Sequence, residues 1–250
     1  MIISASRRTD IPCYHGDYFM ECLKNGKILV NTKYINLKKA DFFIFWTKNV
    51  DPFLKHIKHL PENKYYFQYT LNNYSDLIEK KIPSYMHRLN SFKNLSNLIG
   101  PDKVIWRYDP ILLSDVYTID WHLENFNKMC KDLKSYTNSV KISFIDIYTK
   151  IELLMHNMHI RELKDYEQLA ILEAFNYIAN THNMKLTTCG ESHTKYTGKC
   201  VDDVLINQIT DSNIVYKKDS SQRPLCACHT SIDIGEYKTC KNGCIYCYAN

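Results

Sequence analysis

Short β-rich runs alternate with helical patterns along most of the chain, and this alternation constrains the fold more than any other feature. The runs lie at residues 1–5, 42–47, 65–70, 104–108, 140–145 and 184–188. Runs such as FFIFW are apolar at every position, which is typical of strands in a parallel sheet that is covered on both faces. Because parallel neighbours need a long crossover connection, helices are expected between these strands.

Five helices are predicted between the strands. They cover about residues 17–25, 52–59 and 85–99, a segment with Thr118 as its N-cap, and a segment that begins near Asp165. Apolar side chains recur every three or four residues in the longer ones, which indicates one buried helix face. The alternation implies right-handed βαβ units. The expected fold is a partial or full (β/α) barrel, and a doubly wound open sheet is the alternative.

Most of the predicted strands run into charged residues at their carboxyl ends, where α/β barrels build their active sites. These residues are Arg7, Arg8, Asp10, Lys48, Asn49, Arg107, Asp109 and Glu191. We predict that they surround one pocket and bind its cofactor. Two alternatives stay open, a surface ion pair of Arg7 or Arg8 with Asp10, and a buried Arg107–Asp109 pair that only supports the site.

Three cysteines near the C-terminus have the spacing C-x3-C-x2-C, at Cys240, Cys244 and Cys247. Three thiolates on one short loop can bind three irons of a [4Fe–4S] cluster, which leaves the fourth iron without a protein ligand. The alternative is structural zinc, which takes four ligands and favours paired C-x2-C units. Cys244 and Cys247 form one such pair, and the segment CACH at residues 226–229 could complete a zinc site.

Four further cysteines lie in polar contexts in the C-terminal quarter of the chain, at Cys189, Cys200, Cys226 and Cys228. Four thiolates would complete an auxiliary [4Fe–4S] cluster that has no open iron. The alternative is that they are separate thiols without a shared ligand.

The segment TCKNGCIYCY resembles the cluster-binding loop of the radical S-adenosylmethionine (SAM) superfamily, and especially that of the spore photoproduct lyase group. The whole chain resembles a prokaryotic family of domains of unknown function whose C-terminal cysteines are similar to that loop. The motifs that carry this likeness include ISASRRTDIP, FWTKN, YYFQYTL and VIWRYDPI.

This resemblance implies a radical SAM-type enzyme with a barrel fold. Its cluster would bind SAM at the open iron, take an electron from a donor such as flavodoxin or ferredoxin, and release a 5′-deoxyadenosyl radical. In most of the superfamily the loop follows the first strand, whereas here it ends the chain. The C-terminal tail must therefore fold back over the strand ends. We expect residues 1–210 to form the barrel and residues 211–250 the iron–sulfur-binding tail of one structural unit.

The N-terminal segment MIISASRRTD is no signal peptide, and no apolar run reaches the length of a membrane span, so a cytoplasmic, non-membrane protein is expected. The substrate, a small molecule or another compound, is unknown. The net charge of +5 permits a nucleic acid, but only the similarity to the spore lyase loop suggests one. Two other functions stay open, an iron–sulfur electron carrier or sensor without SAM chemistry, and a zinc-stabilised nucleic-acid-binding protein.

Overall fold

A parallel sheet of seven strands forms the centre of the computed structural model, which describes residues 1–249 apart from the side chain of Thr194. The strands run in the order β8-β7-β6-β5-β4-β1-β9, and all six pairings are parallel. Their bounds are β1 Ile2–Ala5, β4 Phe42–Thr47, β5 Tyr65–Thr70, β6 Val104–Ile111, β7 Ser139–Phe144, β8 Lys185–Thr188 and β9 Ile232–Asp233. The six predicted strands are therefore confirmed.

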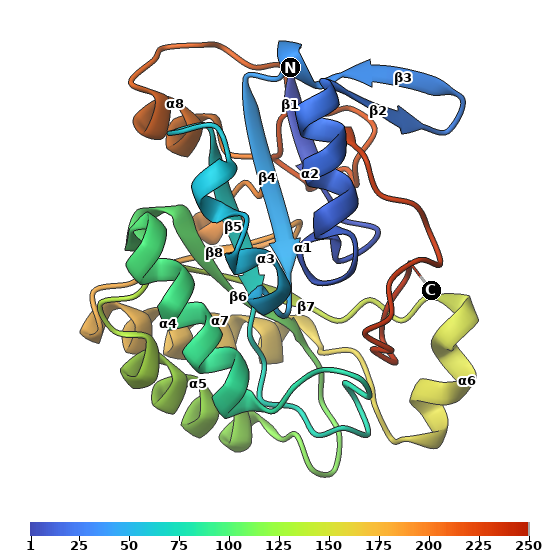
Figure 1. The fold of residues 1–250 in the computed structure, drawn as a ribbon. Helices are drawn as coiled ribbons and strands as arrows, with labels where there is room; N and C mark the ends of the chain where they lie inside the picture. The colour runs from blue at the N-terminus through green and yellow to red at the C-terminus, as the bar shows by residue number, and fades with distance from the viewer. Residues whose placement is uncertain (250) are drawn as a thin grey trace.

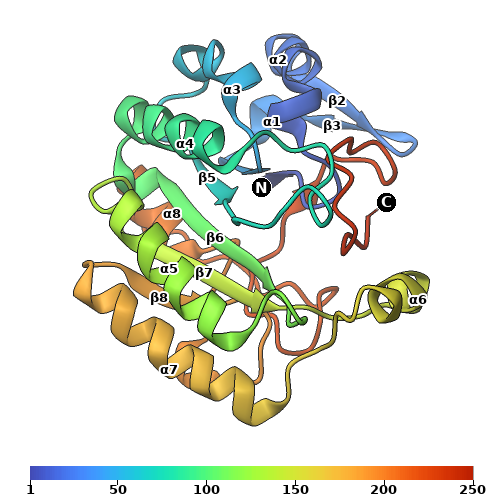
Figure 2. The same cartoon turned by 90° about the horizontal axis from the view of Figure 1, so that it is seen from below.

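From β1 to β8 the order of the strands in the sheet is their order in the chain. This order lacks the reversal that a doubly wound sheet has at its switch point, and it is the order found in (β/α) barrels. The crossover helices follow one another along one side of the sheet, and the C-terminal segment lies on the other side (Figures 1 and 2). These helices are α2 Gly16–Asn25, α3 Asp51–Leu54, α4 Tyr85–Ile99, α5 Ile119–Leu133 and α7 Asp165–Thr181.

The prediction of one helix over residues 52–59 was wrong. The α-helix α3 ends at Leu54, and a 3-10 turn, η2 Ile57–His59, follows it. The backbone N–H of His56 donates to the carbonyl of Phe53, three residues earlier, rather than to the residue four earlier. Phe53 and Ile57 are both buried in this arrangement.

Several short elements were not predicted. They are α1 Ile11–Tyr14, the antiparallel hairpin β2 Lys27–Val30 and β3 Lys33–Asn36, α6 Thr149–Asn157, α8 Asp203–Thr210, and the 3-10 turns η1 Leu37–Lys39, η3 Pro101–Lys103 and η4 Thr194–Tyr196. Within residues 1–249, no helix combines the length and the apolar character that crossing a membrane requires.

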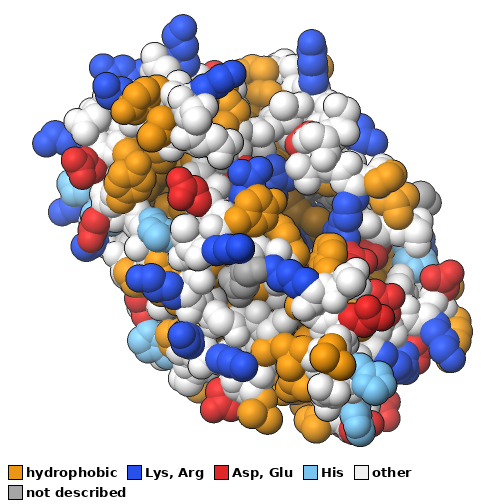
Figure 3. All heavy atoms as spheres, turned by 90° about the vertical axis from the view of Figure 1, so that its right-hand side faces the viewer, with side chains coloured by type: hydrophobic (Ala, Val, Ile, Leu, Met, Phe, Trp, Pro, Cys, Tyr) orange, Lys and Arg blue, Asp and Glu red, His pale blue; other side chains and the backbone are white. Residues whose placement is uncertain are grey.

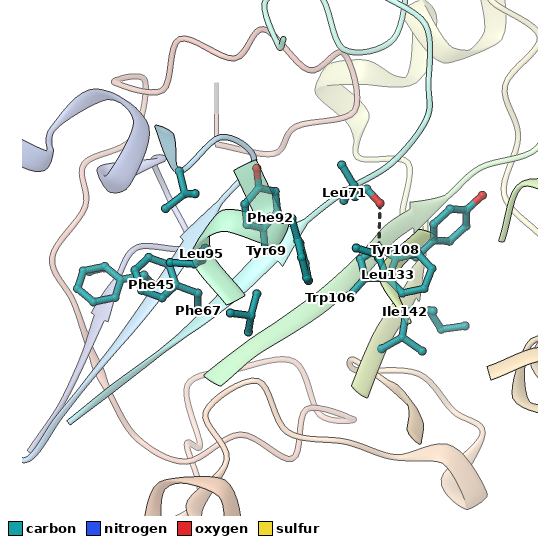
Figure 4. Close-up of a cluster of buried hydrophobic side chains, with 14 of the residues drawn as sticks. Phe45, Phe67, Tyr69, Leu71, Phe92, Leu95, Trp106, Tyr108, Leu133 and Ile142 are labelled. Atoms are coloured by element: carbon teal, nitrogen blue, oxygen red, sulfur yellow. Dashed lines mark hydrogen bonds between the residues drawn. The ribbon is translucent and has the colours of Figure 1, made fainter. Parts of the chain in front are cut away.

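Side chains of the strands alternate between two buried faces, as the uniformly apolar runs predicted. On the helix-facing side, Phe45, Phe67 and Trp106 join one large core with side chains of α4, α5 and α7. Figure 4 shows this core, in which the indole N–H of Trp106 donates to the carbonyl oxygen of Leu71 at 3.0 Å. The Trp106 ring also stacks on Phe126 of α5, with ring centroids 5.1 Å apart.

The opposite side of the sheet, called here the inner face, changes character along the strands. Near the amino ends of the strands it is apolar, with Ile44, Tyr66 and Ile105 packed against Val201 and Ile206 from the C-terminal part of the chain. Near the carboxyl ends the same face carries buried polar side chains, namely Gln68, Arg107, Lys141 and Ser143. The fold therefore buries polar groups at one end of the sheet.

Candidate functional site

A cavity of about 690 Å³ lies at the carboxyl ends of the strands and is lined on one side by residues of the C-terminal segment. Predicted site residues that border it are Arg7, Arg8, Asp10, Lys48, Arg107, Asp109, Cys189, Cys200, Cys226, Cys228, Cys240, Cys244 and Cys247. The face of the molecule on this side is hollowed, with Lys and Arg side chains near the hollow (Figure 3). A second hollow of about 830 Å³ is lined instead by α2 and residues 56–64.

The loop that carries Cys240, Cys244 and Cys247, called here the tail cysteines, is held by backbone hydrogen bonds to the loop that connects β5 to α4. The N–H of Ile245 donates to the carbonyl of Ile78 at 3.0 Å, and the N–H of Lys81 donates to the carbonyl of Asn242 at 3.0 Å. Gly243 has a φ of 67°, a left-handed conformation that glycine adopts without steric cost. Further upstream, β9 pairs with β1. The tail thus folds back to the strand ends.

All ten cysteines are free thiols, and the three tail cysteines border the same cavity. Burial raises the pKa of Cys244 to about 12; the charge of Lys48 opposes this rise, and the charges of Glu79, Cys247 and Cys240 add to it. Burial also raises the pKa of Cys240. A thiol loses its proton when it binds a metal, and three thiols on one loop are the donor set that a [4Fe–4S] cluster with one open iron would require.

Within residues 1–249, no group of three or more His, Cys, Asp or Glu side chains is arranged around one point as the ligands of a single metal ion. A zinc ion holds its thiolate ligands about 2.3 Å away. A [4Fe–4S] cluster instead gives each thiolate a separate iron, so its ligands stand farther apart. A cluster therefore requires several thiols that border one cavity large enough to hold it.

Lys48 connects the end of β4 to the tail. Its Nζ lies 2.8 Å from Oε1 of Glu79 and 2.8 Å from the hydroxyl of Tyr246. Arg88 of α4 lies 3.3 Å from the other carboxylate oxygen of Glu79. Burial alone would raise the pKa of Glu79, but the charges of Lys48 and Arg88 outweigh it and lower that pKa. Glu79 was not predicted, because it lies in a loop without periodic pattern.

The two arginines after β1 have different partners. Arg7 is paired with Asp233 of β9, whose Oδ2 accepts the backbone N–H of Arg7 at 2.9 Å and lies 3.5 Å from its Nε. The Arg8 guanidinium stacks over the ring of Tyr237 at 4.9 Å. Because stacking on a ring leaves the donors of a guanidinium free at its edge, Arg8 is the better candidate to bind a carboxylate.

The alternative of a surface ion pair between Asp10 and an arginine was wrong. Asp10 is buried, and its carboxylate accepts the backbone N–H of Lys48 at 2.8 Å, that of Cys13 at 3.0 Å, and the amide of Asn242 at 3.2 Å. Burial raises the pKa of Asp10. Asp10 therefore joins two strand-end loops to the tail. Asn49 turns away from the cavity, towards Cys13 and the backbone of Asp51.

Arg107 is buried and pairs with the partly exposed Asp109, which is the supporting contact that the sequence left open. Nε and Nη2 of Arg107 lie 3.0 and 2.5 Å from Oδ2 of Asp109, and Nη1 lies 2.9 Å from Sγ of Cys200. Glu191 does not border the cavity directly. Its carboxylate accepts the backbone N–H of Phe144 at 3.0 Å, and burial raises its pKa to about 7.

The cysteines Cys189, Cys200, Cys226 and Cys228, called here the inner cysteines, meet at the inner face of the sheet. The Sγ atoms of Cys189 and Cys200 are 3.1 Å apart, and the backbone N–H of Cys200 donates to Sγ of Cys228 at 3.1 Å. Hydrogen bonds from Cys189 and Cys228 lower the pKa of the Cys200 thiol. The structure thus gathers four thiols that are dispersed in the sequence.

One family model matches the chain over residues 2–249, and its description is a domain of unknown function (DUF1848). No curated protein and no solved structure matches the chain.

Proposed function

The chain belongs to the DUF1848 family, and we propose that it is a radical SAM-type enzyme whose tail cysteines bind a [4Fe–4S] cluster. The observation that carries this proposal is the position of the tail cysteines. Cys240, Cys244 and Cys247 border a cavity at the carboxyl ends of parallel strands, although their loop ends the chain. A ligand in this cavity would therefore lie next to the cluster, where α/β folds hold their substrates.

When bound, a [4Fe–4S] cluster with three protein ligands offers an open iron to the amino and carboxylate groups of SAM and supplies the electron that cleaves its sulfonium C–S bond. The chain's own residues keep the loop in place. Asn242 lies within the cysteine motif and is fixed by Asp10 and by the hydroxyl of Tyr14, at 3.2 and 2.9 Å. Tyr246 is fixed by Glu79 and Lys48.

Arg8 supplies the cationic group for an anion in the cavity. It borders the cavity and rests on the Tyr237 ring, whereas Arg7, Arg107 and Lys48 are each neutralised by a carboxylate. We assign to Arg8 the carboxylate of SAM or of an anionic substrate. The electron comes from a small donor protein such as flavodoxin or ferredoxin.

The experiment is anaerobic reconstitution with iron and sulfide, followed by reduction with dithionite in the presence of SAM. We expect a brown protein that forms 5′-deoxyadenosine, measured by liquid chromatography. The Cys244→Ala variant is expected to lose this product. The matched control is Cys22→Ala, because Cys22 is also a buried thiol but lies in the helix-facing core.

Two outcomes would overturn the proposal. If iron-loaded protein forms no deoxyadenosine and its electron paramagnetic resonance (EPR) spectrum is unchanged by SAM, the cluster serves electron transfer or sensing instead. If the protein takes up zinc rather than iron under the same conditions, the cysteines form a structural zinc site.

A further inference from the structure

The four inner cysteines come from three separate segments that the fold brings to one place. Cys189 follows β8, Cys200 precedes α8, and Cys226 and Cys228 precede β9. The Sγ atoms of Cys189 and Cys200 are 3.1 Å apart, so each can bind its own iron only if these side chains turn about χ1 and the sulfurs separate. Cys226 and Cys228 are two residues apart and join the same buried cluster of side chains as Cys200. Cys228 in turn accepts the backbone N–H groups of Cys200 and Val201 at 3.1 and 3.5 Å. The four thiols thus form one continuous group.

The inner face of the sheet holds this group firmly. The backbone carbonyl of Cys200 accepts hydrogen bonds from the hydroxyl of Tyr66 at 2.5 Å and from the amide of Gln68 at 3.1 Å, both on β5. The N–H of His229 donates to the carbonyl of Val201 at 3.2 Å, which ties the CACH segment to the segment of Cys200. Ligands on such fixed segments are preorganised for a bound group.

Donors that suit thiolates surround the group. Arg107, a permanently charged side chain, donates from Nη1 to Sγ of Cys200 at 2.9 Å. The two backbone N–H groups at Cys228 provide further N–H···S contacts. Hydrogen bonds of this kind to cysteine sulfur stabilise and tune iron–sulfur clusters. All four thiols also border the 690 Å³ cavity, which gives them room for a group larger than one ion.

We propose that Cys189, Cys200, Cys226 and Cys228 bind a second [4Fe–4S] cluster, in which every iron has a cysteine ligand and none is open to SAM. Arg107 donates a hydrogen bond to the Cys200 thiolate of this cluster. The inference does not depend on SAM chemistry at the tail cysteines, because its ligands and its donors are a separate set of residues.

The test compares iron and acid-labile sulfide in three forms of the anaerobically reconstituted protein. The unmodified chain is expected to hold about eight irons and eight sulfides, from two clusters of four. The triple variant Cys240→Ala, Cys244→Ala, Cys247→Ala is expected to hold about four of each, with an EPR signal after reduction that SAM leaves unchanged. The quadruple variant of the inner cysteines is expected to keep a signal that responds to SAM.

A third variant tests the role of Arg107. Arg107→Gln removes a positive charge beside the Cys200 sulfur, so the reduction potential of the cluster in the triple variant is expected to become more negative. The matched control is Arg161→Gln, because Arg161 is half exposed and pairs with Glu167 away from the cavity. An unchanged potential in Arg107→Gln would contradict the assigned hydrogen bond.

Three results would overturn the inference. They are an iron content that the quadruple variant keeps in full, zinc without sulfide in the triple variant, or a Cys189–Cys200 disulfide found by mass spectrometry in anaerobic protein. The last is measured on the unmodified chain and does not require any variant to fold. If the triple variant holds about four irons but the unmodified chain forms no deoxyadenosine, the second cluster is supported and the radical SAM proposal is contradicted.

Discussion

His122 of α5 is expected to make the protein lose stability in mild acid. Its imidazole is fully buried, with Nε2 2.8 Å from the carbonyl oxygen of Leu112 and Nδ1 2.8 Å from the hydroxyl of Tyr108. Because a carbonyl oxygen only accepts, Nε2 carries the proton, and Nδ1 accepts from Tyr108. Protonation of Nδ1 would break this arrangement. Burial accordingly lowers the pKa of His122 from 6.5 to about 4.

The size of the effect follows from this pKa. In the unfolded chain His122 takes up a proton as the pH falls through 6.5, whereas in the folded protein it resists until about pH 4. The unfolded state therefore binds more protons between these values and gains stability relative to the native state. The full loss is about 3 kcal/mol, and about 2 kcal/mol of it is expected between pH 7.5 and pH 5.

The assay is urea unfolding under anaerobic conditions at pH 7.5 and pH 5, for the unmodified protein and for His122→Gln. The amide keeps a donor and an acceptor but does not titrate, so the variant is expected to lose about 2 kcal/mol less than the unmodified protein over this range. The control is His159→Gln, because the side chain of His159 is 71% exposed. Equal losses in the unmodified protein and in His122→Gln would refute the reasoning.

Two further substitutions test how the tail and the core are held. Glu79→Gln leaves the buried cations Lys48 and Arg88 without their carboxylate. The free energy of unfolding, measured by urea titration, is therefore expected to fall by about 3–5 kcal/mol. A fall below about 1 kcal/mol would contradict the buried network. Phe175→Ala removes a buried ring whose centroid lies 3.8 Å from that of Phe126, so the free energy of unfolding is expected to fall by about 3–5 kcal/mol. The control Tyr177→Ala, at an exposed site, is expected to change it by no more than about 0.5 kcal/mol.

The sequence by itself determined the elements whose signal is local. The apolar runs that alternate with helical patterns located six strands. Thr118 marked the start of α5, where its hydroxyl accepts the N–H of Trp121 at 3.2 Å. The spacing of the tail cysteines singled out their loop for the same reason, because the three residues are close in the chain. Family membership also followed from motifs that can be read along the sequence.

Only the tertiary structure decided which distant residues meet. Two-residue β9 is too short for a periodic pattern, yet its pairing with β1 places Asp233 beside Arg7. Glu79 lies in an irregular loop, and only the fold of the tail brings Tyr246 to it. Among the inner cysteines, Cys200 is held to β5 by a hydrogen bond from Gln68, 132 residues earlier, and the segment of Cys226 and Cys228 reaches it through the N–H of His229, which donates to the carbonyl of Val201. Spacing along a chain carries no information about such contacts, because they depend on how the elements pack.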